Sequence, residues 1–415
     1  MHSRNGRLGA AVLTLVVTAG VAQAQVPPEI EAGLLKIGQI VDPGCTAKLY
    51  RPLMPVNDYN TYWPPGASAP ANLNPLYPAI TIAHDQQFGP NAKDVVDVFT
   101  ADKGGDNRPV LIYVPGGAGN KIEQQAREGN AFYDNIGRWA TKNGMVGVTV
   151  QRHPGAGNWD DGGRDISLAV DWLKANIKKY KGNPDRMFIW AHSAGNGPLG
   201  VYIGHPERWK NGVGVKGAVF MSGNPVPGLG GNPGGPLAGA GGRGAGAPGG
   251  APADGAARGA GGPPGGGGGG RGNAVATTCG VAANAADGAI SGPSGVTPNP
   301  NAGRGGGGAG GRGQPLDAAA QAERDNLPGF KKTDVKIMLA RAELDPGVTG
   351  AMTAADMALH DELCKVDATA AKDGVGHCPA MLFAKGESHM SEVFSIDTKD
   401  VTVSGPILAW IKKIK

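Results

Sequence analysis

A serine stands between a strand-like apolar run and a helix-like segment, in Ala191-His192-Ser193-Ala194-Gly195. Small residues lie two places before and two places after it, as required in the sharp strand-to-helix turn that exposes a nucleophilic hydroxyl. Alanine takes the first of these places, where glycine is commoner. An ordinary turn that happens to contain a serine is the alternative interpretation. The succession of strand, pentad and helix favours a nucleophile at Ser193.

A serine hydroxyl is a weak nucleophile at neutral pH, so it needs a neighbouring base that an acid orients. After a serine in this kind of turn, the acid comes next along the chain and the histidine last. Three histidines come late enough: His360, His377 and His389. His360 falls in a helical pattern and His377 precedes an apolar run, whereas His389 follows one. We therefore predict that His389 is the base.

Two carboxylates follow the apolar run at 335–340, namely Glu343 and Asp345. A carboxylate just past the end of a strand can reach across to a histidine that follows the neighbouring strand. Both residues meet this condition. Pro346 makes a turn-forming pair with Asp345, which favours Asp345 as the acid and leaves Glu343 as the alternative.

A Gly-Gly-Ala-Gly segment begins at residue 116, directly after the apolar run at 110–114. Attack of a serine on an acyl group creates an oxyanion, which needs backbone N–H donors that are already in place. Glycine lets the backbone turn its N–H groups inward. We predict donors at Gly117 or Ala118 and at Ala194, the residue after the nucleophile. No Gly-Lys-Ser/Thr ending follows, which argues against a phosphate-binding loop.

Short apolar runs alternate with helical patterns on both sides of these residues. This alternation predicts an α/β fold, with a mostly parallel central sheet flanked by helices on both faces. The expected strands lie at 94–99, 110–114, 145–150, 187–190, 215–221, 335–340 and 380–384, and the expected helices at 165–177, after residue 193, at 351–364 and at 407–414.

The composition changes between residues 228 and 315. About half of the 72 glycines of the 415-residue chain lie there, with no aromatic residue and only two acids. Such a segment buries too little apolar surface to offset its ordering entropy, so we predict a disordered Gly/Ala/Pro-rich insertion. This insertion separates the two parts of the predicted catalytic domain, residues 25–227 and residues 316–415. Its Arg-Gly pieces are also typical of RNA binding, but the formal net charge is only +4 and no basic, aromatic stripe is present. We expect no nucleic-acid partner.

The first 24 residues have the parts of a signal peptide. Arg4 and Arg7 precede the apolar run at 10–21, and a small-residue cleavage pattern ends at Ala24. The apolar run is shorter than the roughly 20 residues that cross a bilayer, so a membrane anchor is not expected. The sequence thus predicts an exported protein, periplasmic or extracellular after cleavage.

Four cysteines then fall in an oxidising compartment and allow three pairings. The short loop between Cys364 and Cys378 closes easily, which favours that disulfide and leaves Cys45 with Cys279. The histidines show neither His-x-His nor His-Glu-x-x-His spacing, so no metal site is expected.

These pieces together resemble the α/β-hydrolase superfamily, and specifically secreted bacterial carboxylesterases related to hormone-sensitive-lipase-like and feruloyl-esterase-like enzymes. The matching segments cover most of residues 80–415 apart from the insertion. The resemblance is carried by 88–99, 115–118, 165–177, 183–195, 343–346 and 388–391. It implies hydrolysis of small-molecule carboxylic esters through an acyl-serine, without a cofactor.

The chain departs from this family at two places. Pro115 stands where a histidine usually begins the oxyanion loop, so other residues must hold that loop. The insertion follows 215–221, where many relatives carry a helical lid, so the size of the substrate stays open. A serine peptidase or an acyltransferase with the same triad remains an alternative. So does a catalytically inactive hydrolase fold used for binding, although the full set of Ser193, Asp345 and His389 argues against it.

Overall fold

The computed structural model describes residues 26–54, 79–117, 132–152, 162–227, 229, 325–366 and 375–415. The predicted signal peptide lies outside these residues, and so does the predicted insertion at 228–315 apart from residue 229. The two parts of the predicted catalytic domain contribute strands to one sheet.

The centre of the molecule is an eight-stranded sheet in the order β1-β2-β4-β3-β5-β6-β7-β8. Strand β2 pairs antiparallel with both β1 and β4, and every later pairing is parallel. The predicted mostly parallel sheet is thus confirmed. The strands are β1 (Ile80–Gln87), β2 (Val95–Ala101), β3 (Arg108–Val114), β4 (Val146–Val150), β5 (Gly182–His192), β6 (Gly217–Met221), β7 (Lys336–Leu344) and β8 (Ala380–Ser388).

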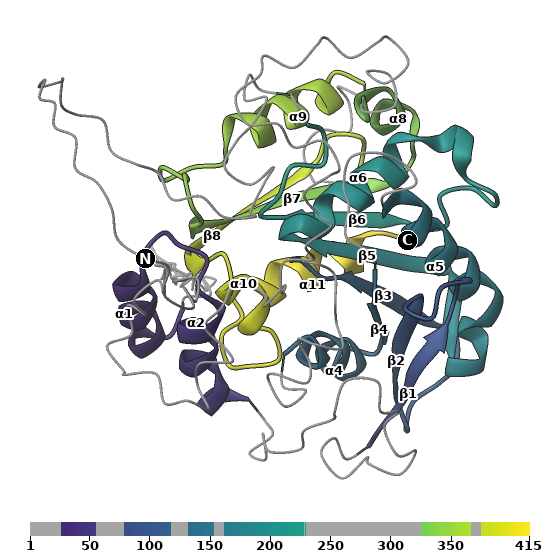
Figure 1. Ribbon diagram of the computed structural model, residues 1–415, viewed down its shortest axis with the longest axis horizontal. Helices are drawn as coiled ribbons and strands as arrows, with labels where there is room; N and C mark the ends of the chain where they lie inside the picture. The colour runs from purple at the N-terminus through teal and green to yellow at the C-terminus, as the bar shows by residue number, and fades with distance from the viewer. Residues whose placement is uncertain are drawn as a thin grey trace, which may run out of the picture.

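Helices cover both faces of the sheet (Figure 1). One face carries α1 (Pro28–Ile37), α2 (Pro43–Tyr50), α4 (Asp134–Lys142), α10 (Ser391–Phe394) and α11 (Ser404–Lys413). The other face carries α5 (Arg164–Asn176), α6 (Asn196–Gly204), α8 (Leu327–Lys332) and α9 (Ala354–Cys364). Short 3-10 turns lie at η1 (Arg51–Leu53), η3 (Ile177–Tyr180), η4 (Ser193–Gly195) and η5 (Pro206–Arg208).

A hydrophobic core lies on each face of the sheet, and together the two cores explain why the central strands are continuous apolar runs. On β5, Phe188 and Trp190 pack toward α4 and α11, whereas Ile189 and Ala191 pack toward α5 and α6. Successive side chains of a strand point to opposite faces, so a strand covered on both faces needs apolar residues at every position. Burying one such large side chain contributes about 1.5–3 kcal/mol to folding.

Strands β7 and β8 extend beyond the apolar runs that indicate them in the sequence. β7 continues through Glu343 to Leu344, and β8 continues to Ser388. Their ladder hydrogen bonds involve the backbone and do not require apolar side chains at the strand ends. Asp345 and His389 therefore come directly after the carboxyl ends of two neighbouring parallel strands.

Six helices and strands were missed by the sequence patterns: β1, α1, α2, α4, α8 and α10. β1 is an edge strand that pairs with β2 alone, and most of its side chains are exposed or only partly buried. α1 buries only Ile30, Leu34 and Ile37, so its apolar face is narrow. Neither segment presents the long apolar run on which the prediction rested.

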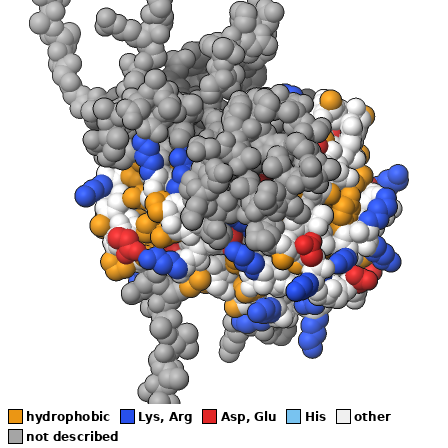
Figure 2. Space-filling model, turned by 90° about the horizontal axis from the view of Figure 1, so that it is seen from below, with side chains coloured by type: hydrophobic (Ala, Val, Ile, Leu, Met, Phe, Trp, Pro, Cys, Tyr) orange, Lys and Arg blue, Asp and Glu red, His pale blue; other side chains and the backbone are white. Residues whose placement is uncertain are grey.

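On the described part of the face seen in Figure 2, Lys and Arg side chains are scattered, with a few Asp and Glu side chains between them. Among the helices of the described ranges, none has the length and apolar character needed to span a bilayer.

Candidate active site

Ser193 occupies the turn between β5 and α6. Its backbone φ is +53°, a left-handed conformation that a residue with a side chain rarely adopts. The turn is closed by near contacts: a Cβ at Gly195 would lie 2.7 Å from the carbonyl oxygen of Val114, and one at Gly116 would lie 2.8 Å from Cβ of Ser193. Glycine is therefore required at both places for the backbone to pass this close to the serine.

Asn196 fixes this turn to the neighbouring strand. Its buried Nδ2 donates to the carbonyl oxygens of Ser193 and Met221, each at 2.8 Å. Met221 is the last residue of β6, so one side chain ties the strained turn to the end of the next strand. Strain of this kind persists only where the surroundings hold it, and it is common at functional sites.

The predicted base and acid lie beside this serine. Nε2 of His389 is 2.8 Å from Oγ of Ser193, and Nδ1 of His389 is 2.6 Å from Oδ1 of Asp345. Asp345 and His389 are buried, whereas Ser193 is partly exposed. The three side chains thus form a continuous chain of hydrogen bonds from a buried carboxylate to a hydroxyl that solvent can reach, which is the geometry of a serine nucleophile with its base and orienting acid.

A buried arginine holds the other oxygen of the Asp345 carboxylate. Nη1 of Arg341 donates to Oδ2 of Asp345 at 3.0 Å, while its Nε and Nη2 form a fork with Asp356 at 3.0 and 2.8 Å. Burial alone would raise the pKa of Asp345, but the hydrogen bond to His389 and the charge of Arg341 outweigh it, so the pKa is lowered. Asp345 is therefore ionised and fixed in orientation, as an acid that orients an imidazolium must be.

The alternative acid, Glu343, takes a different position. Its Oε2 accepts the backbone N–H of Gly386 at 2.8 Å, which links β7 to β8. The structure brings Asp345 to His389, and it directs Glu343 to the neighbouring strand.

Of the three predicted oxyanion donors, Gly117 and Ala194 are described, and Ala118 lies outside the described residues. Gly117 has φ +58°, and Ala194 is exposed in η4, next to Ser193. Gly117 therefore adopts a left-handed backbone conformation that glycine accommodates without steric cost.

Arg152 holds the start of this loop and was missed in the sequence. It follows β4, is 2% exposed, and donates from Nη2 to the carbonyl oxygen of Gly117 at 2.8 Å and from Nε to that of Pro115 at 3.2 Å. Burial lowers the pKa of Arg152 to about 10, so the guanidinium remains charged at neutral pH. An arginine after a strand has no distinctive spacing, so its role becomes visible only when β3 and β4 are paired.

A second histidine supports the backbone of His389. The Nε2 atom of His192 lies 2.8 Å from the carbonyl oxygen of His389, and the two ring centroids are 4.8 Å apart. Burial, and then the neighbouring His389, lower the pKa of His192 to about 3. His192 is therefore a neutral imidazole that donates to the carbonyl of the histidine next to the serine.

Two buried acids, Glu387 and Asp400, lie beside the segment that carries His389. The hydroxyl of Tyr50 donates to Oδ2 of Asp400 at 2.9 Å and approaches Oε2 of Glu387 at 3.3 Å, and Ser391 Oγ donates to that same Oε2. Burial, followed by the charge of Asp400, raises the pKa of Glu387 well above its usual range. The Glu387 carboxyl thus links the two ends of the 387–391 segment, which carries His389, through Ser391.

Two clusters of metal-binding side chain types occur among the described residues. His192, His389 and Glu392 form one, and His360, Cys364 and Cys378 form the other; within each, the candidate ligand atoms lie within 4.8 Å of one another. In the first cluster both imidazoles already make the hydrogen bonds described above. In the second, Cys364 and Cys378 are joined in a disulfide. Cys45 is also disulfide-bonded, and its predicted partner Cys279 lies outside the described residues.

Parts of this chain are similar to known proteins. Residues 96–208 match the family model described as BD-FAE. Secreted lipase 5 of Gibberella zeae is 37% identical over 60 residues, which are 14% of this chain and 11% of that protein. Gut esterase 1 of Caenorhabditis elegans is 31% identical over 105 residues, 22% of this chain and 18% of that protein. The matched segments span less than one fifth of each of these two relatives.

Among solved structures, a truncated form of a carbohydrate esterase from gut microbiota aligns over 80% of this chain and 95% of its own, with 12% identity and a TM-score of 0.47. The sheet order and the turn at Ser193 define an α/β-hydrolase fold, and residues 96–208 within it match the BD-FAE family model.

Proposed function

We propose that this protein is an exported carboxylic-ester hydrolase that works through an acyl-serine intermediate. The observation that carries the proposal is the chain of hydrogen bonds from Asp345 through His389 to Ser193, with Ser193 held at positive φ. The names of the matched relatives, a secreted lipase and a gut esterase, support the same reaction class and, for the first, export.

The proposed reaction begins when His389 Nε2 accepts the Ser193 Oγ proton as Oγ attacks the acyl carbon. The negative charge that develops on the acyl oxygen is stabilised by backbone N–H groups of Ala194 and of Gly117 or Ala118. Asp345 stabilises the imidazolium, which then gives its proton to the leaving alcohol. Water, activated by the same histidine, hydrolyses the acyl-serine and restores the hydroxyl.

A serine peptidase or an acyltransferase would use the same side chains, because these activities differ only in the leaving group and in the acceptor. The partial exposure of Ser193 favours neither of them. Both are weaker proposals than ester hydrolysis, since the matched relatives are a lipase and an esterase by name.

The test is a series of p-nitrophenyl esters from acetate to palmitate, with Ser193→Ala as the control and a panel of peptide amides alongside. Ester turnover that disappears in Ser193→Ala supports the proposal. Turnover of amides alone would favour the peptidase, and the absence of any turnover would favour an inactive binding protein. Ester turnover that survives in Ser193→Ala would mean that Ser193 is not the nucleophile.

A further inference from the structure

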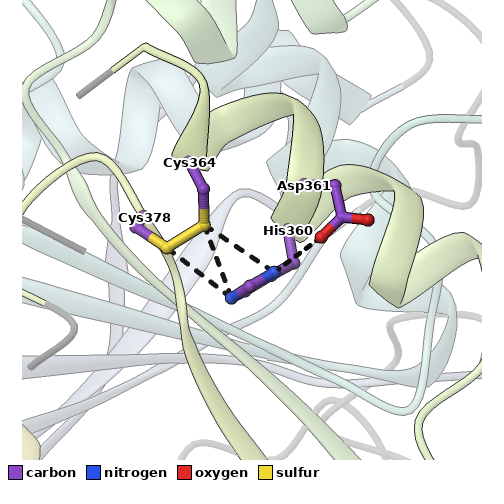
Figure 3. Close-up of a disulfide and its surroundings, with 4 residues drawn as sticks. All are labelled: His360, Asp361, Cys364 and Cys378. Atoms are coloured by element: carbon purple, nitrogen blue, oxygen red, sulfur yellow. Dashed lines mark hydrogen bonds and ion pairs between the residues drawn. A yellow bond between two sulfur atoms is a disulfide. The ribbon is translucent and has the colours of Figure 1, made fainter. Parts of the chain in front are cut away.

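A histidine packs against the disulfide that joins the end of α9 to the residues before β8 (Figure 3). Nε2 of His360 lies 3.4 Å from Sγ of Cys364 and 3.6 Å from Sγ of Cys378. His360 and Cys364 are four residues apart on one helix, so their side chains share a face. This cluster lies outside the site of Ser193, and the proposed ester hydrolysis does not use it.

We propose that His360, Cys364 and Cys378 form a binding site for Zn²⁺ once the disulfide is reduced. Reduction by a dithiol passes two electrons and two protons to the Sγ–Sγ bond, which gives two thiols and a cyclic disulfide of the reductant. Binding of Zn²⁺ then releases the two thiol protons, because zinc is coordinated by thiolates. Two thiolates and one imidazole are ligands that Zn²⁺ prefers, with water completing the tetrahedron.

The positions of the three ligand atoms suit this metal. With Zn–S near 2.3 Å and Zn–N near 2.0 Å, a tetrahedral site places a sulfur and a nitrogen about 3.5 Å apart. The two distances from Nε2 of His360 to the sulfurs are already 3.4 and 3.6 Å. The two sulfurs have to separate to about 3.8 Å, which breaking their bond permits. The imidazole also has to turn so that the Nε2 lone pair faces the ion, because Nδ1 lies 3.7 Å from Sγ of Cys364.

The surroundings of His360 also resemble those of a metal-binding imidazole. Nδ1 of His360 lies 3.1 Å from Oδ1 of Asp361 and 3.7 Å from Sγ of Cys364, while Nε2 lies within 3.6 Å of both sulfurs. Histidines that ligate metals usually donate their other N–H to a carboxylate in this way. His360 and Cys364 are partly exposed and Cys378 is buried, so an ion can enter from solvent and one coordination position can hold water.

The position of the site gives it a structural consequence. α9 carries Asp356 in its first turn, which holds Arg341 and through it Asp345, and β8 ends directly before His389. The disulfide therefore ties together the two elements that support the acid and the base. A bound Zn²⁺ would keep this connection when the covalent bond is absent.

The test uses the full chain, reduced with a dithiol that is then removed without admitting oxygen, and titrated with Co²⁺ as a spectroscopic substitute for Zn²⁺. We expect thiolate-to-cobalt charge-transfer absorption that saturates at one ion per chain and disappears when Zn²⁺ is added. The oxidised protein should show none. The double variant Cys364→Ser/Cys378→Ser should also show none after reduction, and this variant retains the thiols released at Cys45 and its partner.

Histidine variants separate this site from a general affinity of thiols for metal. We expect His360→Ala to weaken Zn²⁺ binding more than about 100-fold and Asp361→Ala about 10-fold, measured by competition with a chelator. His377→Ala is the matched control, since His377 adjoins Cys378 in sequence but is not one of the three proposed ligands, and its affinity should match the wild type. Unchanged binding in His360→Ala, or loss in His377→Ala instead, would overturn the assignment.

Reduction itself can loosen the fold, so a second measurement is the near-UV circular dichroism during reduction with Zn²⁺ present. We expect Zn²⁺ to preserve the signal in the wild type and not in His360→Ala, whose oxidised form is first shown to be folded. Equal loss in both proteins, with no Zn²⁺ retained by either after dialysis, would contradict the proposal. These measurements do not use esterase activity, so their outcome is independent of the proposed function.

Discussion

Arg152 donates from Nη2 to the carbonyl oxygen of Gly117 at 2.8 Å, from a position that is almost fully buried. This contact, together with the one from Nε to the carbonyl oxygen of Pro115, holds the described start of the loop. In the esterases that this chain resembles, the corresponding loop begins with a histidine, which is Pro115 here. The guanidinium after β4 accordingly holds the loop in this chain.

Arg152→Met should therefore lower kcat for ester hydrolysis, by about 10- to 100-fold, because a misplaced donor loses part of the roughly 100- to 1000-fold effect of a single oxyanion donor. KM should change less than kcat. Arg138→Met is the matched control, since Arg138 is equally buried but pairs with Asp397 near α4. An unchanged kcat in folded Arg152→Met would show that the loop holds itself.

Removing Arg341 should destabilise the protein and alter its acid response. Arg341→Met leaves the buried Asp345 and Asp356 carboxylates without their shared cation, which costs about 3–5 kcal/mol of unfolding free energy. Lys331→Met removes a partly exposed ion pair with Glu362 and should cost far less, because solvent screens that pair. Urea unfolding at pH 7 measures both, and equal effects would contradict the importance of the buried cation.

The same variant tests the pKa of Asp345. This pKa is lowered in the folded protein, so the unfolded state binds more protons below about pH 4, and the wild type loses stability as the pH falls through the folded pKa. Without Arg341, one cause of the lowering is absent and this acid-dependent loss should be smaller. A loss of the same size in both proteins would mean that Arg341 has no influence on the ionisation of Asp345.

The raised pKa of Glu387 makes the stability of the protein depend on pH with the opposite sign. Its pKa is raised in the folded protein, so the folded state binds more protons than the unfolded state above about pH 4.5, and stability falls as the pH rises. Glu387→Gln, which keeps a neutral group of the same shape, should flatten this fall between pH 5 and 8 and retain esterase activity. Glu387→Leu should lose activity, because Tyr50 and Ser391 lose their acceptor. A fall of the same size, or a steeper one, in Glu387→Gln would contradict a raised pKa of Glu387.

The near contact at Gly195 predicts a large effect of a single methyl group. Gly195→Ala places Cβ about 2.7 Å from the carbonyl oxygen of Val114, so the strand or the serine turn must shift, and we expect kcat to fall by about 100-fold or more. Gly405→Ala is the control: its nearest contact would be an ordinary 3.8 Å, and alanine in α11 should stabilise by about 0.5–1 kcal/mol. Wild-type activity in Gly195→Ala would show that the turn is not tightly closed.

The sequence indicated the fold and the positions of Ser193, Asp345 and His389 because each follows an apolar strand, and parallel strands place such residues at one edge of the sheet. It left Asp345 and Glu343 as alternatives, because the apolar run ends at residue 340 whereas β7 continues to Leu344. Glu343 therefore lies within the strand and Asp345 directly after it. Arg152, His192 and the Tyr50–Glu387 contact act through partners distant in sequence. Their roles depend on pairing and burial, which no local spacing encodes.

The most direct test of the proposed mechanism is the mass of the enzyme after rapid acid quenching during turnover of a p-nitrophenyl ester. We expect an acyl adduct on Ser193, formed at one equivalent per chain together with a burst of p-nitrophenol. In Ser193→Ala we expect neither the adduct nor turnover. An adduct on another residue, or hydrolysis that continues in Ser193→Ala, would contradict the proposed mechanism.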